Sequence, residues 1–184
     1  MSQSPDRQGE RGARDAAPQS FEHGMLDLMP SLRRYARSLT RSDADGEDLL
    51  QDSLERALVK RGQWAGGSLK AWAFSIMTNL YRNDALRATR RRTAPLDEAQ
   101  DVPSTLSPPG DPLERRKLVA AIDSLAPDFR AVLMLVVVES MSYREVASLL
   151  QIPEGTVMSR LARARAQIAR ILEADNVIPM RRSE

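Results

Sequence analysis

The chain has 184 residues, 42% of them hydrophobic, with 27 lysine and arginine residues against 25 aspartate and glutamate residues. It contains no cysteine and a single histidine, His23, which excludes disulfides, thiolate chemistry, cysteine-ligated zinc and multi-histidine metal sites. No run approaches the ~18 apolar residues that cross a membrane, and the first residues lack the apolar core of a signal peptide. We therefore expect a cytoplasmic protein without membrane insertion that is not an enzyme, holds no metal and needs no cofactor.

Prolines and polar residues divide the chain into two modules. Residues 1–21 are polar without a hydrophobic period, and residues 93–112 carry five prolines and four acidic residues with no base, a composition typical of an extended linker. Helix formers dominate the remainder. The sequence predicts an all-α fold: two small helical bundles, residues 22–92 and 113–174, joined by a flexible acidic linker, with tails at 1–21 and 175–184.

Three helices are predicted in the first module. The first spans about residues 26–39 and has Pro30 in its first turn. The second begins with an S-x-x-D start at Ser42 and Asp45. It buries leucines at four-residue spacing: Leu50, Leu54 and Leu58. Ser68 caps the third helix. That helix buries an apolar stripe: Leu69, Ala73, Ile76 and Leu80.

The second module carries clear helix-start signals. Asp111 and Pro112 begin one helix. Its apolar face is expected to be Leu118, Ile122 and Leu125. Pro127 opens a second helix whose run 132–138 is apolar on every side, so this helix is expected at the centre of the bundle. Ser142 and Glu145 then form a capping box for a third helix.

Residues 141–168 have the layout of a helix-turn-helix motif: a capped helix, a turn holding Pro153 and Gly155, and a second helix from Thr156. In such motifs the second helix enters the major groove of DNA. Spacings of three, four and seven residues put four polar side chains on its outer face: Thr156, Ser159, Arg160 and Arg163. Arginine reads guanine bidentately, whereas serine and threonine select less strongly. A solvated helix of an all-α core is the alternative.

Arginines are concentrated in two segments. Five lie between Tyr81 and Arg92 against one acid, Asp84, and four lie between Thr156 and Ile171 against none. The acidic linker separates the two segments. Two polyanion contacts are therefore favoured over two solvated helix faces.

These motifs resemble a known family. SYREVASLLQIPEGTVMSRLARARAQI, residues 142–168, resembles domain 4 of the sigma-70 superfamily in its small extracytoplasmic-function group. DADGEDLLQDSLERAL (43–58) and LKAWAFSIMTNLYRNDALRATRRR (69–92) are similar to domain 2 of the same family. The resemblance implies a dissociable subunit that directs core RNA polymerase to −35/−10 promoters. The second module is also similar to the alphaproteobacterial general-stress type.

The resemblance implies roles for particular residues. A largely acidic face of the second helix would bind the clamp coiled coil of the polymerase's largest subunit. The residues of this face are Asp48, Gln51, Asp52 and Glu55. The flap of the polymerase would be a further contact of the chain. Residues of the third helix would melt and read the −10 element: Lys70, Asn79, Arg82, Asn83 and Arg87. The arginines at its end would bind phosphates: Arg90, Arg91 and Arg92. The outer face of the recognition helix would read the −35 element.

The family builds a base pocket at the loop 62–68. The nearby aromatic residues that could stack on an unpaired base are Trp64, Trp72 and Phe74. For Trp72 a place in the core is favoured, so the loop backbone with Asn79 is preferred for reading the base. One departure from the family is Met158, where many relatives have lysine or arginine, so a −35 contact is missing or apolar.

A small helical anti-sigma factor is expected to contact both modules. Two other functions stay open. A sigma-like decoy would sequester an anti-sigma factor, but such decoys carry a receiver domain that does not fit here. A stand-alone helix-turn-helix transcription regulator would dimerise on palindromic DNA.

Overall fold

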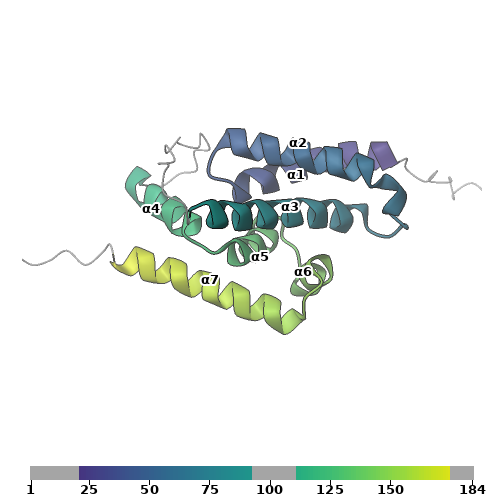
Figure 1. Cartoon of the computed structure of the whole chain (residues 1–184). Helices are drawn as coiled ribbons and strands as arrows, with labels where there is room; N and C mark the ends of the chain where they lie inside the picture. Colours follow the sequence, from purple (N-terminus) through teal and green to yellow (C-terminus); the bar gives the residue numbers. More distant parts are fainter. Residues whose placement is uncertain (1–20, 93–110, 175–184) are drawn as a thin grey trace, which may run out of the picture.

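A computed structural model describes residues 21–92 and 111–174, with side chains placed for all of these except residues 89–92. Within those ranges the chain forms seven α-helices and one 3₁₀ turn, without a strand: α1 (Phe21–Leu39), α2 (Asp43–Val59), η1 (Arg61–Gln63), α3 (Leu69–Arg92), α4 (Pro112–Asp123), α5 (Pro127–Val137), α6 (Tyr143–Leu150) and α7 (Glu154–Ala174). The predicted all-α fold of two small bundles is confirmed. Figure 1 shows α1 and α2 above α3 and α5 to α7 below it, with α4 at the left at about the height of α3.

Helix α1 begins at Phe21, five residues earlier than predicted, so Pro30 lies inside the helix and not in its first turn. A proline there removes one backbone hydrogen bond. Packing of the first turns compensates, since Met25 is buried and the Phe21 ring contacts the rings of Trp64 and Trp72 at centroid distances of 5.9 and 5.8 Å. Tertiary contacts therefore extend the helix past its apparent start.

Helix α2 begins as predicted, because the Ser42 side chain accepts a hydrogen bond from the Asp45 amide. Its buried face was predicted wrongly in part. Leu58 is 52% exposed and Leu54 is half-buried. The residues that face the core follow a stripe at i, i+3, i+4, i+7 and i+11: Gly46, Leu49, Leu50, Ser53 and Ala57. A small residue at 46 lets α1 approach closely, and this contact fixes which face turns inward.

Helix α3 is capped by Ser68, whose Oγ accepts a hydrogen bond from the Ala71 amide. Its buried stripe is centred one residue away from the prediction. The fully buried residues are Ala73, Phe74, Met77 and Thr78, whereas Leu69, Ile76 and Leu80 are half-buried. The Tyr35 hydroxyl of α1 pairs with Thr78 Oγ1 at 2.9 Å, and burial raises the pKa of Tyr35 well above its ordinary value.

In the second bundle, Asp111 caps α4 through the Leu113 amide, as predicted. Leu118 was predicted to be buried and is 41% exposed. The core-facing positions of this part are Ala121 and Leu125. The apolar run that begins at Val132 is buried through Leu135, and only its end is open, with Val137 58% exposed.

Helix α5 is central because it packs against helices of both bundles. It contacts α6 and α7 of its own bundle and also α1 and α3 of the first bundle. Buried residues of both bundles consequently form one hydrophobic cluster, which includes Leu39 and Met77 on one side and Val132 and Leu161 on the other. The predicted linker residues 93–110 lie outside the described part of the chain, and α4 begins at Pro112.

Candidate nucleic-acid interface

The helix-turn-helix is built as the sequence predicted, with a start of α7 two residues earlier. Ser142 and Glu145 form the capping box of α6: the Ser142 amide donates to Glu145 Oε2 at 2.8 Å, and the Glu145 amide donates to Ser142 Oγ at 3.3 Å. The Ser142 hydroxyl, which donates to Glu145 Oε2 at 2.7 Å, and the Ser142 amide together hold the pKa of Glu145 below its ordinary value. Gln151 ends α6 in a left-handed conformation (φ 54°), so that the chain turns sharply and α7 begins at Glu154, ahead of Gly155.

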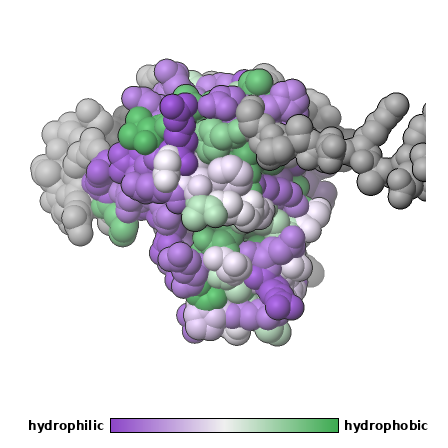
Figure 2. All heavy atoms as spheres, turned by 90° about the vertical axis from the view of Figure 1, so that its right-hand side faces the viewer, coloured by the Kyte–Doolittle hydropathy of each residue, from purple (hydrophilic) through white to green (hydrophobic). Residues whose placement is uncertain are grey.

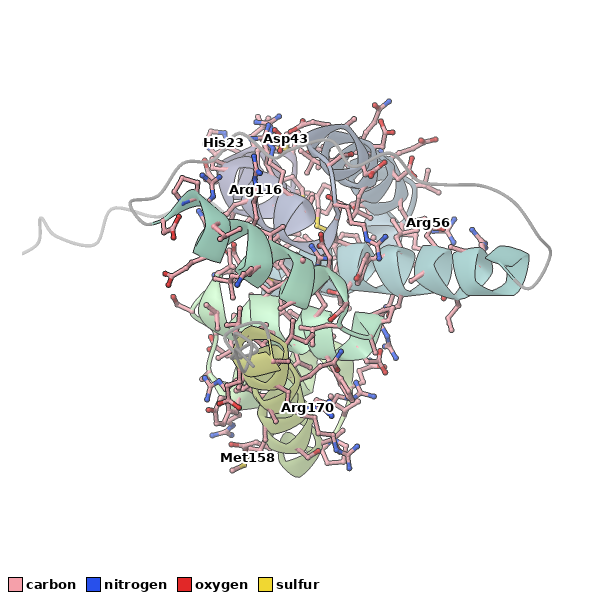
Figure 3. The ribbon with its side chains drawn as sticks, turned by 90° about the vertical axis from the view of Figure 1, so that its left-hand side faces the viewer. His23, Asp43, Arg56, Arg116, Met158 and Arg170 are labelled. Atoms are coloured by element: carbon pink, nitrogen blue, oxygen red, sulfur yellow. The ribbon has the colours of Figure 1, made fainter. Side chains whose placement is uncertain are left out.

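Helix α7 has a buried face and an open face. Val157, Leu161 and Ala164 are buried, whereas Ile168 is half-buried. On the open face Met158 is 54% exposed, and Figure 3 shows it at the side of the second bundle away from the first bundle. The helix therefore presents its first turns to solvent, as a recognition helix must.

The four predicted DNA-reading residues of α7 do not all lie in the open. Ser159 and Arg163 are exposed, and Thr156 is half-buried. Ser159 Oγ donates to the Thr156 carbonyl at 3.1 Å. The Arg160 side chain is only 20% exposed, because its Nη2 forms an ion pair at 2.8 Å with Asp128 Oδ2 of α5. Two of the four positions are therefore exposed, Thr156 is partly covered, and Arg160 is held against the protein.

The residues predicted to contact the −10 element lie along α3, and Lys70 and Asn79, nine residues apart, lie on opposite faces of the helix. Lys70, Asn79, Asn83 and Arg87 are exposed, and Arg87 pairs with Asp84 at 3.2 Å on the same helix. Arg82 is half-buried because its Nε forms an ion pair with Asp128 Oδ1. The backbone of α3 continues through the last predicted group, but the side chains of this group lie outside the described residues: Arg90, Arg91 and Arg92.

A cavity of about 310 Å³ opens beside the loop that follows η1. It is lined by residues of α1, the loop and the start of α3: Gly24, Asp27, Leu28, Trp64, Gly67, Leu69 and Lys70. The loop turns here through Gly66 and Gly67 at φ 93° and 85°, a conformation that glycine adopts without strain. The buried Trp64 Nε1 has no hydrogen-bond acceptor among the described residues.

The three aromatic residues considered for base stacking lie in different surroundings. Trp64 lines the cavity, whereas Trp72 is half-buried against Phe21. Phe74 is fully buried, so its predicted stacking role is wrong. Figure 2 shows the end of the molecule at which η1 and the beginnings of α3 and α7 lie: hydrophobic residues gather near the middle of this face and hydrophilic residues surround them.

The residues predicted to bind polymerase, three of them acidic, are all exposed on α2: Asp48, Gln51, Asp52 and Glu55. They lie off the buried stripe of that helix. Their neighbour Glu47 is engaged differently: it accepts hydrogen bonds from Arg33 at 3.0 Å and from Arg37 at 3.0 Å. The predicted four thus remain available to a partner, and Glu47 fastens α2 to α1.

Sequence reasoning missed the charged residues between the bundles. Arg34 of α1 holds Glu139 through two hydrogen bonds, at 2.9 and 3.0 Å. Arg130 of α5, which is 5% exposed, donates to the Ser38 and Thr40 carbonyls at the end of α1. The sequence did hold a signal for these contacts: Arg130 and Glu139 flank the apolar run 132–138. A charge buried beside such a run is costly unless it is paired, which indicates that both side chains have partners.

Two features are absent from the described residues. None of the helices in the described residues has the length and apolar character needed to cross a membrane. The same residues contain no group of three or more histidine, cysteine, aspartate or glutamate side chains arranged to hold a metal ion.

Known proteins resemble both bundles. Residues 25–78 match the family model "Sigma2 domain of PhyR", and residues 115–168 match "Sigma-70, region 4". The chain is 35% identical over 159 residues to the ECF RNA polymerase sigma factor EcfG of Rhodopseudomonas palustris (strain TIE-1), covering 85% of this chain and 87% of that protein. It is also 35% identical over 158 residues to the ECF RNA polymerase sigma factor SigE of Mycolicibacterium smegmatis, covering 83% and 62%.

Solved structures show the same fold. The sigma factor RpoE from Bartonella quintana, in complex with the anti-sigma factor NepR, aligns with a TM-score of 0.67 at 27% identity, covering 86% of this chain and 99% of that chain. The anti-anti-sigma factor PhyR of the same organism, also complexed with NepR, aligns with a TM-score of 0.58 at 18% identity, covering 82% of this chain and 50% of that chain. The second likeness concerns the fold alone.

Proposed function

The chain belongs to the extracytoplasmic-function family of RNA polymerase sigma factors, of the general-stress type, and on that premise we propose which surface performs each step of promoter recognition. As a sigma factor it binds core RNA polymerase and directs initiation at specific promoters. We assign −35 recognition to α7, −10 recognition to α3 with the adjoining cavity, and polymerase binding to the acidic face of α2. The observation that carries the proposal is a capped helix-turn-helix whose second helix leaves Ser159 and Arg163 exposed.

The −35 assignment depends on the open face of α7. Helices of this motif place their first turns at base edges in the major groove. Arg163 has the reach to donate bidentately to guanine, and the exposed Met158 offers an apolar surface to a thymine methyl group. A −35 element read by this chain therefore combines a guanine contact with an apolar thymine contact. Arg160 joins these contacts only after it leaves Asp128.

The −10 assignment depends on the cavity beside α3. Melting a promoter requires a pocket that holds an extruded base by stacking and by bonds to its pairing edge. Trp64 supplies an aromatic wall and a buried indole N–H without an acceptor, and Lys70 supplies a cation at the rim for a phosphate. Asn79, exposed on the same helix, carries both a donor and an acceptor and suits a second base.

The polymerase assignment depends on charge and exposure. Three carboxylates and one amide project from α2 without facing the core, and they present a negative surface to a basic coiled coil: Asp48, Asp52, Glu55 and Gln51. The second bundle would contact the flap. A chain similar over nearly its whole length has been solved with an anti-sigma factor, which supports a small helical anti-sigma factor that contacts both bundles here.

Run-off transcription with purified core RNA polymerase tests the function directly. We expect specific transcripts with the wild-type chain, about a 10-fold loss with Arg163→Glu, and unchanged activity with Arg170→Glu, an exposed arginine farther along α7. Promoters come from transcript start sites mapped after overexpression. The absence of specific initiation above the level of core polymerase alone overturns the proposal.

A sigma-like decoy is the second candidate, because residues 25–78 match the sigma2 domain of PhyR and the PhyR chain shares the fold. A decoy need not keep a DNA-reading helix, yet the open face of α7 retains Ser159 and Arg163. An electrophoretic shift of promoter DNA in the presence of core polymerase separates the two functions, since a decoy gives no shift. A stand-alone regulator would instead shift DNA without polymerase.

A further inference from the structure

In the part of the chain that the structure describes, Met158 of α7 is the most exposed methionine. It is 54% exposed, whereas Met29 of α1 is half-buried against the hydrophobic core. The other methionines of the described residues are at most 7% exposed: Met25, Met77, Met134 and Met141. Among these thioethers, that of Met158 is therefore the most accessible to a dissolved reagent.

The space beside Met158 is open. Figure 3 shows this residue at the side of the second bundle away from the first bundle. Gly155 lies three residues earlier and is a neighbour of Met158 on the surface of α7. A Cβ added at Gly155 would meet no atom within 4 Å. The first turn of α7 is therefore uncovered on this side.

The chain offers an oxidant no thiol, because none of its 184 residues is a cysteine. Hydrogen peroxide oxidises a thioether to a sulfoxide. In this step the O–O bond breaks and an S–O bond forms. The sulfur loses two electrons, and the second peroxide oxygen leaves as water with both protons. The product is polar and chiral, and methionine sulfoxide reductases convert it back to methionine.

The position of Met158 gives this oxidation a consequence for DNA. In the −35 assignment above, the Met158 side chain offers an apolar surface to a thymine methyl group. A sulfoxide oxygen in that place needs a hydrogen-bond donor, and a methyl group supplies none. Oxidation therefore removes the apolar contact, whereas the exposed Ser159 and Arg163 are chemically unchanged.

We propose that Met158 is an oxidation site at which hydrogen peroxide or a related peroxide lowers the preference of the chain for −35 elements with a thymine at this contact. The inference rests on the proposed function, because it uses the same recognition helix. Met158 lies on α7, and the residues assigned to polymerase binding lie on α2. Oxidation at Met158 thus changes promoter recognition without altering the polymerase-binding face.

Peptide mapping by mass spectrometry, after brief exposure of the full-length chain to hydrogen peroxide, tests the chemistry. We expect Met158 to be oxidised at least about 5-fold faster than the four buried methionines, with circular dichroism recorded in parallel to show that the helices are intact. An equal or slower rate overturns the proposal. No DNA or polymerase is present, so this outcome is separate from the run-off transcription on which the proposed function depends.

Run-off transcription measures the consequence of the oxidation. Each protein is treated with peroxide, desalted and compared with its own untreated sample. We expect treatment to lower the activity of the wild type about 5-fold and that of Met158→Leu by less than about 1.5-fold. Met29→Leu is the matched control, because it removes a different thioether and should lose as much activity as the wild type. Reductase treatment should restore the wild type, and equal losses in wild type and Met158→Leu overturn the proposal.

Deoxyuridine in place of single thymines of the −35 element removes one methyl group at a time and identifies the contacted base. We expect one such replacement to reduce transcription by the untreated wild type about 3-fold. At that replaced promoter, oxidation should have little further effect. If no replacement reduces transcription, or if oxidation acts fully at every replaced promoter, the methyl contact is overturned.

Discussion

Replacing Arg130 by methionine tests how firmly the two bundles are docked. Arg130 lies on α5 and is almost completely buried. It donates to the Ser38 carbonyl at 3.0 Å, to the Thr40 carbonyl at 2.7 Å and to Asp123 Oδ1 at 2.6 Å. Methionine retains most of the aliphatic volume and removes every donor, so the variant isolates the hydrogen bonds and the charge.

The magnitude follows from the groups left without a partner. Hydrogen bonds to charged groups contribute about 1.5–3 kcal/mol each, and removing one partner of a buried ion pair costs about 3–5 kcal/mol. The Asp123 side chain is 21% exposed, so water compensates it in part. We therefore expect Arg130→Met to lower the free energy of unfolding by about 3 kcal/mol, the lower end of that range.

Urea denaturation followed by circular dichroism measures the effect. The wild type should unfold in one transition, because one hydrophobic cluster spans both bundles, and the variant should unfold earlier and less cooperatively. Arg170→Met, at an exposed position of α7, is the matched control and should change the free energy of unfolding by less than about 0.5 kcal/mol. A cost below about 1 kcal/mol for Arg130→Met would show that the bundles do not dock through this residue in solution.

Four further substitutions test local parts of the fold and the site. Gly46→Ala should destabilise the protein by about 1–3 kcal/mol in thermal melts, because a Cβ at this position would lie 3.1 Å from the α1 backbone. Gly155→Ala should instead stabilise the protein by up to about 1 kcal/mol, because a Cβ there would meet no neighbouring atom within 4 Å. Equal effects of the two substitutions would refute the close approach of α1 to Gly46. Ser142→Ala should cost about 1 kcal/mol. The hydrogen bonds of Ser142 lower the pKa of Glu145, so their contribution to the free energy of unfolding is present above the ordinary pKa of that carboxyl and is lost as the pH falls through the lowered value. The difference in stability between the wild type and the variant should therefore shrink in acid. A difference that does not depend on pH would contradict this reasoning. Asn79→Ala should reduce run-off transcription about 10-fold without changing the affinity for core polymerase, measured by pull-down, since it removes a base contact only.

Signals local to a few residues predicted the helices well. Ser42, Ser68, Asp111 and Ser142 each begin a helix, because a side chain that caps free amides acts within three residues and needs no tertiary partner. The start of α1 could not be predicted in this way. Two tryptophans distant in the sequence stabilise its first turn, and the helix continues through its proline.

Burial was predicted less well where a helix has more apolar residues than one face can bury. Leu58 and Leu118 fit the expected spacing, yet both are exposed, because neighbouring helices select a different face of α2 and α4. Small residues mark those faces instead, Gly46 on α2 and Ala121 on α4. Spacing predicts that a stripe exists, and close approach of a second helix decides where it lies.

For the candidate site, the sequence predicts which residue types lie on α3 and α7 but not their partners. The exposures of Ser159, Arg163 and Asn79 agree with an open DNA face. The engagement of Arg82 and Arg160 depends on Asp128, which is far from Arg82 in the sequence and becomes its neighbour only when the bundles dock. Long-range pairing of this kind leaves no periodic signal in the chain.

The apolar run of α5 links the stability of the fold to the binding of a partner. A helix that is apolar all round needs cover on every side, and α5 obtains it from α6 and α7 on one side and from α1 and α3 on the other. When the bundles separate, the side of α5 that faces α1 is exposed to solvent. The apolar wall of a nearby cavity of about 220 Å³, to which Met134 and Ile122 contribute, is exposed with it. Exposed apolar surface of this kind favours association with a partner. Separating the two bundles should therefore cost less free energy when the surface of a partner covers this side of α5.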